Sequence, residues 1–387
     1  MPLANALLRA PPAPDAEPRF PLELVFCPRC TLVQITVDVA PEELFCDYAY
    51  FSSYSDTMVR HAALLAERTI RERSLGERSL VVEVASNDGY LLSSYANAGV
   101  RVLGIEPARN VARVAIRRGV PTLCEFFGRE LAHDLARDGL AADVLHAHNV
   151  LAHVPDLHGF LDGIEALLSE RGIACIEVPH VRSLVDGCEF DTIYHEHLAY
   201  FSLTALVALV ARHGLAVASV ERIPVHGGSL RVFVGRARST EPDGSVASLL
   251  AEERRWGVGD LATYRGFAER AVRLRDRLAE LLHDRSARGA AIAGYGASAK
   301  GCILLNWLGA AGQTLRWIAD KSPHKQGRLL PGVHTPVVAP ERIAGDRPDY
   351  LLLLVWNIAD EVMAQQRAFA AQGGRFVVPI PTVEVIG

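Results

Sequence analysis

Two histidine-bearing stretches carry the side chains best suited to moving protons. His153 lies in the run NVLAHVPD, and Tyr194, His195, Glu196 and His197 follow one another in the second stretch. Imidazole gains and loses a proton near neutral pH, while phenol and carboxyl groups hydrogen-bond a developing charge. Because such a cluster is costly to bury unless its members hydrogen-bond one another, the pattern predicts an acid-base site.

Metal binding is the alternative interpretation of these histidines, and a second metal pattern lies near the start of the chain. His195 and His197 have the i, i+2 spacing that a zinc or iron site could use, with a third ligand from elsewhere. Cys27 and Cys30 form a CxxC pair between two strand-like runs, which is half of a zinc knuckle. A structural zinc takes four ligands. Cys46 is a candidate for a third, and the alternative is two unpaired thiols on a turn.

Residues 79–99 form the element expected to anchor a ligand. An apolar strand, a turn with Asn87 and Asp88, and a helix make the first step of a doubly wound sheet. Residues 100–107 predict a second strand with Glu106 at its end, whose carboxylate is placed to accept hydrogen bonds from both hydroxyls of a ribose. Ala85 stands where such turns usually have glycine.

Further strands are predicted at 142–150 and 172–179, on either side of a helical stretch at 156–172. With Glu106, this order of strands resembles the class I methyltransferases, which bind S-adenosylmethionine at these strand ends. The residues predicted to bind that methyl donor are Glu83, Ala85, Asn87, Asp88, Glu106, Pro107 and Asn149. A dinucleotide is the alternative ligand, although the first turn lacks the GxGxxG pattern that brings a pyrophosphate to a helix N-terminus.

The last third of the chain repeats the strand, turn and helix pattern. After a charged helical stretch at 244–288, the run GAAIAGYGASAKG predicts a buried strand, a glycine turn at 294–296 and a helix. The helix N-terminal amides could hold a phosphate, with Ser298 and Lys300 nearby. The alternative is that the glycines serve only close packing of strand and helix. Together with the later strands, the pattern predicts a second, smaller α/β domain.

Composition sets the bounds on size, partners and compartment. At 387 residues with 50% hydrophobic side chains, the chain can bury several cores. The net charge of −5 comes from scattered charges without a basic stripe, so we expect no nucleic-acid partner. No apolar run approaches the roughly 20 residues of a membrane span, and no signal peptide is evident, which predicts a cytoplasmic protein without a membrane partner. Seven cysteines without regular spacing fit a reducing compartment.

The order of the motifs along the chain is that of a known family. The CxxC pair is followed by DYAYFSSYS, VEVASNDG, NVLAHVPD, YHEHLAYFS, VHGGSLRVF, GYGASAKG and DKSPHKQG. This order resembles the three-domain sugar C-methyltransferases, which add branching methyl groups to nucleotide-linked deoxysugars. The resemblance covers essentially the whole chain. It implies an α/β protein whose class I methyltransferase Rossmann domain, residues 77–236, is flanked by an N-terminal zinc-type module, residues 1–76, and a C-terminal Rossmann-like sugar-nucleotide domain, residues 237–387. The family's architecture also suggests a monomer.

The resemblance also implies roles for individual residues. His197 becomes the general base, Glu196 and Tyr194 orient its ring or hydrogen-bond an enolate oxygen, His153 adds a hydrogen bond, and Tyr48 closes the site. The implied contacts to the sugar nucleotide are Tyr295, Ser298, Lys300 and Lys321.

The family holds a structural zinc with two CxxC pairs. Cys27 and Cys30 match the second pair, and the sequence begins just after the position of the first. Either translation starts upstream, or the protein lacks a full zinc site.

Methyl transfer to carbon constrains the substrate. A sugar carbon becomes nucleophilic as an enolate, which forms readily only beside a ketone, so the expected substrate is a nucleotide-linked 4-keto sugar, with dTDP as the family's usual carrier, methylated at C3. The sulfonium loses its charge on transfer, so the mechanism needs no metal for charge neutralisation. Two alternatives stay open: an O- or N-methyltransferase of another secondary metabolite, and a non-catalytic binding protein that keeps the fold.

Overall fold

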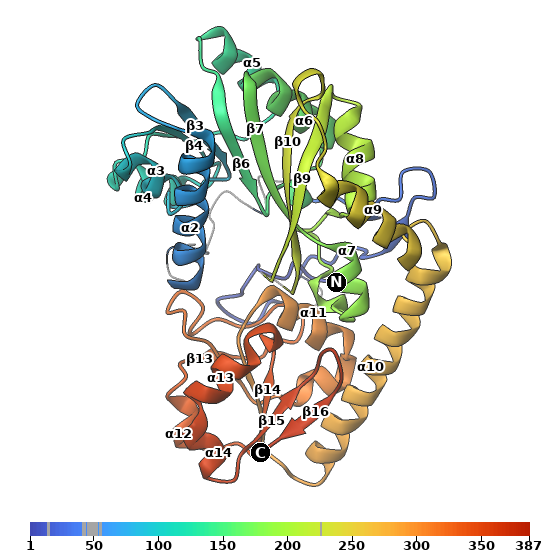
Figure 1. Ribbon diagram of the computed structural model, residues 1–387. Helices are drawn as coiled ribbons and strands as arrows, with labels where there is room; N and C mark the ends of the chain where they lie inside the picture. Colours follow the sequence, from blue (N-terminus) through green and yellow to red (C-terminus); the bar gives the residue numbers. More distant parts are fainter. Residues whose placement is uncertain (14–15, 41–43, 45–52, 54–55, 225–226) are drawn as a thin grey trace.

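The computed structural model describes residues 1–13, 16–40, 44, 53, 56–224 and 227–387. Figure 1 shows a large twisted sheet in the upper half, a smaller sheet in the lower half, and the long helix α10 (Leu261–Ala287) running down one side. No helix in the described ranges combines the length and the apolar character needed to cross a membrane.

The upper sheet has seven strands in the order β5-β4-β3-β6-β7-β10-β9. The first five are mutually parallel, whereas β10 runs antiparallel to both β7 and β9. Their bounds are Leu80–Val84 (β3), Arg101–Ile105 (β4), Thr122–Leu123 (β5), Ala142–His148 (β6), Leu168–Pro179 (β7), Leu215–Ile223 (β9) and Ser229–Arg236 (β10). The strand order reverses between β3 and β6. Ligands of doubly wound sheets bind at the carboxyl ends of the strands at this point.

Helices cover both faces of this sheet, and the strands β3, β6 and β10 are accordingly buried along nearly their whole length. Helices α2 (Asp56–Arg73), α3 (Leu92–Asn97) and α4 (Arg109–Arg117) pack on one face. Helices α5 (Arg129–Arg137), α6 (Leu157–Leu167) and α8 (Leu203–Ala211) pack on the other, and α9 (Gly244–Trp256) packs beside β9. Helix α6 stops at residue 167, five residues before the predicted end, because the chain from 168 pairs with β6 as the start of β7.

A three-stranded antiparallel sheet joins the N-terminal region to the rest of the molecule. It contains β1 (Leu24–Phe26), β2 (Val33–Ile35) and β8 (Ala199–Tyr200). We call residues 194–197 the acid-base stretch. Strand β8 begins two residues after His197, so this stretch leads directly into the sheet that carries the CxxC turn. Short helix α7 (Val181–Asp186) packs in the same core.

The lower sheet follows α10 and has the order β13-β12-β11-β14-β15-β16, parallel except for β16. The strands are Ile292–Tyr295 (β11), Ile318–Ala319 (β12), Val337–Val338 (β13), Tyr350–Leu353 (β14), Arg375–Val378 (β15) and Glu384–Ile386 (β16). The helices are Ala299–Trp307 (α11), Arg342–Asp346 (α12), Ala359–Gln365 (α13) and Arg367–Ala371 (α14). The predicted second α/β unit therefore forms, while the domain limits at 76/77 and 236/237 stay a prediction.

Candidate active site

Glu106 joins the turn after β3 to the turn after β4, beside the point where the strand order of the upper sheet reverses. It follows β4 directly, and its two carboxylate oxygens accept hydrogen bonds from the main-chain N–H groups of Asn87 and Ala108, both at 2.8 Å. Burial raises the pKa of Glu106, while these two amide hydrogen bonds lower it. Pro107 lies half-buried between the carboxylate and Ala108. The arrangement fixes the carboxylate at the place where the sequence predicts a ribose.

The turn after β3 has a left-handed backbone at positions that are not glycine. Ala85 has φ = 54° and Asn87 has φ = 50°, and Asn149, after the neighbouring strand β6, has φ = 53°. Such conformations are uncommon outside glycine and concentrate at functional sites. Ala85 thus adopts the conformation for which this turn usually has glycine.

Several polar side-chain atoms around this turn are buried without a partner. They have no hydrogen bond to any residue that the structure describes, and they are Glu83 Oε2, Ser86 Oγ, Asp88 Oδ1 and Asn149 Oδ1. Buried polar atoms are nearly always satisfied by protein, water or ligand. This set therefore fits a polar ligand such as the predicted methyl donor.

Asp88 is held in place from two sides. It is fully buried, Ser53 donates a hydrogen bond to Oδ2, and Arg118 pairs with the same oxygen at 2.8 Å. Because Oδ2 is engaged in this way, it is Oδ1 that is left for a ligand.

His197 lies in a hydrogen-bond arrangement that fixes its tautomer. Its Nδ1 is 2.8 Å from the main-chain oxygen of Thr192, and its Nε2 is 3.0 Å from the hydroxyl of Tyr194. A carbonyl oxygen only accepts, so Nδ1 carries the hydrogen of the neutral ring. Nε2 therefore has the lone pair, and the Tyr194 hydroxyl donates to it. This is the geometry of a basic nitrogen beside a hydrogen-bond donor.

His153 and Glu196 complete the cluster. The His153 ring lies 4.9 Å from the His197 ring between centroids, and its Nδ1 donates to the main-chain oxygen of Glu196. Burial lowers the pKa of His153, against the hydrogen bonds to main-chain oxygens that raise it. Burial raises the pKa of Glu196 to about 7, against a lowering by the hydrogen bond from Asn5. Four of the predicted catalytic residues thus lie together, whereas Tyr48 lies outside the described residues.

His195 points away from this cluster. It is buried, its Nε2 donates to the main-chain oxygen of Pro21 at 3.0 Å, and its ring meets the edge of Phe20. Since His195 and His197 are engaged by different parts of the chain, their i, i+2 spacing does not produce a metal site within the described ranges. There, the one group of three close metal-binding side chains is His146, His148 and Cys175, on strands β6 and β7.

The CxxC pair does not complete a zinc site in the part of the chain that the structure describes. Cys27 and Cys30 are half-exposed on the turn between β1 and β2. No further cysteine, histidine or acidic side chain described by the structure joins them as a third ligand, and Cys46 lies outside the described residues. Two thiolates leave a tetrahedral zinc half open, so the described residues do not fit a structural zinc.

The glycine turn of the lower sheet is capped by protein groups. Ser298 accepts a hydrogen bond from the main-chain N–H of Gly301 at 3.1 Å, and Asp320 accepts one from that of Ala297 at 2.8 Å. Tyr295 is buried in the sheet, and Lys321 is exposed. It is Lys325, which the sequence did not single out, whose ammonium contacts the Ala297 carbonyl oxygen at 2.8 Å. The role of this turn in binding a sugar nucleotide stays a prediction.

Comparison with known proteins identifies the family. Three family models match: a "Putative zinc binding domain" at residues 1–45, a "Methyltransferase domain" at 58–220 and a "C-methyltransferase C-terminal domain" at 224–381. The chain is 42% identical to C-methyltransferase NovU of Streptomyces niveus, over all of this chain and 92% of that protein. It belongs to the C-methyltransferase family. It is therefore an S-adenosylmethionine-dependent enzyme that methylates carbon, in preference to the O- or N-methylation considered from its sequence.

Two solved methyltransferase structures each resemble less than half of this C-methyltransferase. Magnesium protoporphyrin IX methyltransferase of Synechocystis PCC 6803 with bound S-adenosylmethionine is 14% identical, covers 46% of this chain and 80% of its own, and has a TM-score of 0.34. An S-adenosylmethionine-dependent methyltransferase of Clostridium acetobutylicum is 8% identical. The match covers 46% of this chain and 92% of that protein, with a TM-score of 0.37.

The C-methyltransferase anchors its acid-base stretch through contacts that sequence reasoning missed. The Trp356 indole of the lower α/β unit donates to Asp191 Oδ2 at 2.7 Å, and Lys300 Nζ lies 4.5 Å from the centroid of the Trp356 ring. Burial raises the pKa of Asp191 to about 6, against the lowering effects of Lys300 and Trp356. Asp191 stands only three residues before Tyr194, so proximity in sequence was the single available signal.

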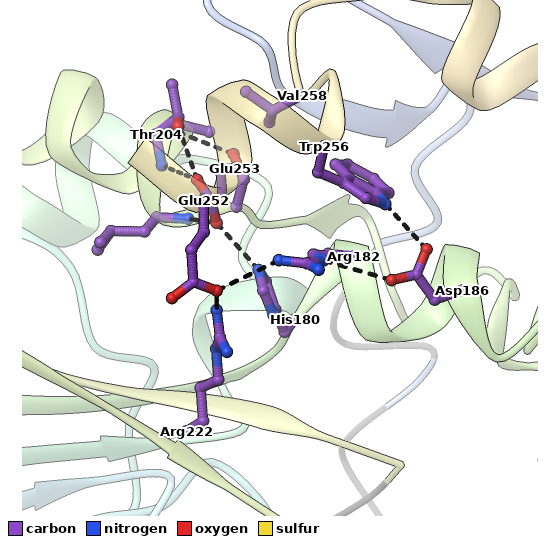
Figure 2. Close-up of polar contacts among 12 residues, drawn as sticks. His180, Arg182, Asp186, Thr204, Arg222, Glu252, Glu253, Trp256 and Val258 are labelled. Atoms are coloured by element: carbon purple, nitrogen blue, oxygen red, sulfur yellow. Dashed lines mark hydrogen bonds and ion pairs between the residues drawn. The ribbon is translucent and has the colours of Figure 1, made fainter. Parts of the chain in front are cut away.

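A buried carboxylate joins the start of α8 to the residue that follows β7. Figure 2 shows Glu253 of α9 pointing toward His180 and Thr204. Glu253 has no exposed surface and accepts hydrogen bonds from His180 Nε2 (2.9 Å) and from the main-chain N–H groups of Leu203 (2.7 Å) and Thr204 (2.8 Å). It thereby satisfies two N-terminal amides of α8, where a negative charge is favourable. Strand β8, which follows His197, leads into this helix.

Proposed function

We propose that this C-methyltransferase acts on a nucleotide-linked 4-keto-deoxyhexose, carried by dTDP, and methylates C3 after His197 has removed the C3 proton. The observation that carries the proposal is the tautomer of His197. The Thr192 carbonyl holds Nδ1–H, so Nε2 is the basic nitrogen, and it faces the hydroxyl of Tyr194 at 3.0 Å. A fixed imidazole lone pair is suited to accept a proton from carbon near neutral pH.

The neighbouring residues then have distinct tasks. As the C3 proton moves to Nε2, that nitrogen no longer accepts from Tyr194, whose hydroxyl is released to donate to the enolate oxygen. His153 is held against the main-chain oxygen of Glu196, beside the His197 ring. S-adenosylmethionine, when bound, supplies an electrophilic methyl group. The residues fitted to hold it are those at the reversal point, with Glu106 toward the ribose hydroxyls and Asp88 and Asn149 offering buried oxygens.

Product analysis with a matched histidine variant tests this proposal. The purified protein is incubated with S-adenosylmethionine and a dTDP-4-keto-2,6-dideoxyhexose, and the sugar product is followed by mass spectrometry and NMR. We expect one added methyl group on C3, and a fall in turnover of about 10² to 10⁴ in His197→Ala. His133→Ala, at an exposed histidine, should match wild type. Methylation at a different atom, or full activity of His197→Ala, would overturn the proposal.

A further inference from the structure

The first 21 residues contact the acid-base stretch at two points. The Asn5 side-chain amide donates to Glu196 Oε1 at 2.6 Å, and the main-chain oxygen of Pro21 accepts from His195 Nε2 at 3.0 Å. The same segment is tied to the lower α/β unit, because Leu8 forms a β-bridge with Leu329. A segment that lies 191 positions from Glu196 in the sequence is therefore part of the active-site wall.

Glu196 is bound differently at each of its oxygens. Its carboxyl group is buried, with only 5% of the residue exposed, and Oε1 accepts from Asn5. Its main-chain oxygen accepts from His153. Oε2 makes no hydrogen bond with any residue in the described ranges. The C=O oxygen of a carboxylic acid is a stronger acceptor than its C–OH oxygen, so the amide N–H of Asn5 on Oε1 favours the proton on Oε2.

We propose that Asn5 is a positioning residue that directs the proton of the Glu196 carboxyl group to Oε2, from which the acid donates a hydrogen bond to the substrate ketone oxygen. This inference rests on the proposed function, in which that ketone becomes an enolate. The C3–H electron pair forms the new carbon–carbon π bond, the carbonyl π pair moves to oxygen, and the proton goes to His197 Nε2. Glu196 keeps its own proton throughout and stabilises the developing negative charge, as a preorganised donor does.

The surroundings of Glu196 agree with a carboxylic acid in this role. Burial raises its pKa to about 7, against the hydrogen bond from Asn5, so the protonated form is well populated at neutral pH. Asn5 faces it from the N-terminal segment and His153 from the turn after β6, while Tyr194, His195 and His197 lie beside it on its own stretch. A carboxyl group kept neutral by an apolar site is a known type of oxyanion donor.

The pH dependence of turnover distinguishes an acid from a base. If protonated Glu196 is the active form, activity falls as the pH rises through its pKa. Asn5→Ala removes a donor that stabilises the carboxylate, so the pKa of Glu196 rises. We therefore expect this high-pH limb to move upward by about one pH unit and kcat at the optimum to fall about tenfold, with KM little changed. Asn5→Asp places a second carboxyl group against the first and should move the limb further. Asn97→Ala, at an exposed asparagine, is the control.

Glu196→Gln provides a second, independent arm. With Asn5 donating to the amide oxygen, the amide nitrogen takes the place of Oε2 and still donates, so this variant should keep a tenth or more of wild-type kcat and lose the high-pH limb. Glu196→Ala should lose both its activity and the high-pH limb of its pH profile. Three results would each overturn the proposal. The first is a low-pH limb of the kcat profile that moves upward in Asn5→Ala, and the second is a high-pH limb that does not move in that variant. The third is a Glu196→Gln variant as inactive as Glu196→Ala.

A measurement without substrate separates this inference from the proposed function. Infrared titration of the full chain follows the protonated carboxyl band that disappears in Glu196→Gln. We expect its midpoint to rise in Asn5→Ala and to stay at the wild-type value in Asn97→Ala. If the midpoint moves while no 4-keto sugar is methylated, only the proposed substrate fails. If the midpoint stays, the role of Asn5 is wrong whatever the substrate.

Discussion

The hydrogen bond between Tyr194 and His197 joins the two groups that the proposed reaction uses most directly. The donor and the acceptor are set by the Thr192 carbonyl, which occupies the opposite nitrogen of the ring. The ring is also close to His153, and its centroid lies 4.1 Å from that of the Tyr194 ring, with the two planes tilted by 35°. Its position is therefore defined by contacts on several sides, as general-base catalysis requires.

Removing the Tyr194 hydroxyl should affect the rate more than binding. Tyr194→Phe keeps the ring contact with His197 and removes only the donor that passes to the enolate oxygen. We expect kcat to fall about 10- to 100-fold, with a smaller change in KM, because the lost interaction forms mainly in the transition state. Steady-state kinetics measure this split, and a variant with raised KM and unchanged kcat would show that the hydroxyl only binds substrate.

The left-handed backbone of Ala85 yields a stability prediction. A left-handed residue other than glycine is strained by about 1–2 kcal/mol, and glycine in turn loses about 0.5–1 kcal/mol through its freer unfolded state. Ala85→Gly should therefore lie within about 1 kcal/mol of wild type, whereas the β-branched Ala85→Val should lose about 2 kcal/mol or more. Urea denaturation compares the two. Equal losses in both variants would mean that backbone conformation does not govern this position.

At the scale of the elements, α9 joins the start of α8 to the end of β7 through a buried charge. Glu253 reaches from this helix to the first amides of α8 and to His180 at the end of β7 (Figure 2). Burial alone would raise its pKa, but the hydrogen bonds from His180, Thr204 and Leu203 hold the pKa below its usual value. The carboxylate is thus the stabilising form.

Replacing this carboxylate should destabilise the fold in a pH-dependent way. Glu253→Gln leaves main-chain donors without their charged acceptor and should lower the free energy of unfolding by about 2–4 kcal/mol at pH 7. Because the folded-state pKa is lowered, the contribution is complete above the ordinary glutamate value of about 4.3 and is lost as the pH falls through the folded value. The difference in the free energy of unfolding between Glu253→Gln and wild type should accordingly become smaller in acid.

The neighbouring Glu252 offers a matched control for the Glu253 experiment. It lies on the same helix and pairs with Arg182 and Arg222 at a partly exposed site (Figure 2). Exposed ion pairs contribute little, so Glu252→Gln should change stability far less than Glu253→Gln does. Denaturation at pH 7 and at about pH 3 tests both variants, and similar losses in the two at pH 7 would contradict a special role for the buried carboxylate.

At the scale of the whole molecule, local patterns predicted the elements and missed the contacts between them. The strand, turn and helix at β3 and α3, and Glu106 at the end of β4, follow from hydrophobic periodicity and turn residues close together in sequence. The contacts of Asn5 with Glu196 and of Trp356 with Asp191 join residues 191 and 165 positions apart. No periodicity signals such pairs, because tertiary packing alone brings them together. For the same reason, the pairing of β8 with the N-terminal strands was not expected.

Zinc binding by the N-terminal region is a further property that can be tested on the whole chain. A family model for a zinc-binding domain matches residues 1–45, yet the described residues supply two thiols, Cys27 and Cys30. We predict that a chelator shifts the melting temperature of this 387-residue chain by less than about 2 °C. Cys27→Ser should behave as Cys124→Ser does, a variant at an exposed cysteine. One zinc per chain that survives dialysis and is lost in Cys27→Ser would contradict this.

Hydrogen exchange at carbon tests the central claim most directly. The enzyme and a dTDP-4-keto-2,6-dideoxyhexose are incubated in deuterated buffer with S-adenosylhomocysteine, which has no methyl group to transfer, and deuterium at C3 is followed by NMR. The account predicts exchange at C3 by wild type and by His133→Ala, and a loss of about 100-fold or more in His197→Ala. Exchange by His197→Ala at the wild-type rate, or a sugar that wild type methylates but never exchanges, would contradict proton removal by His197.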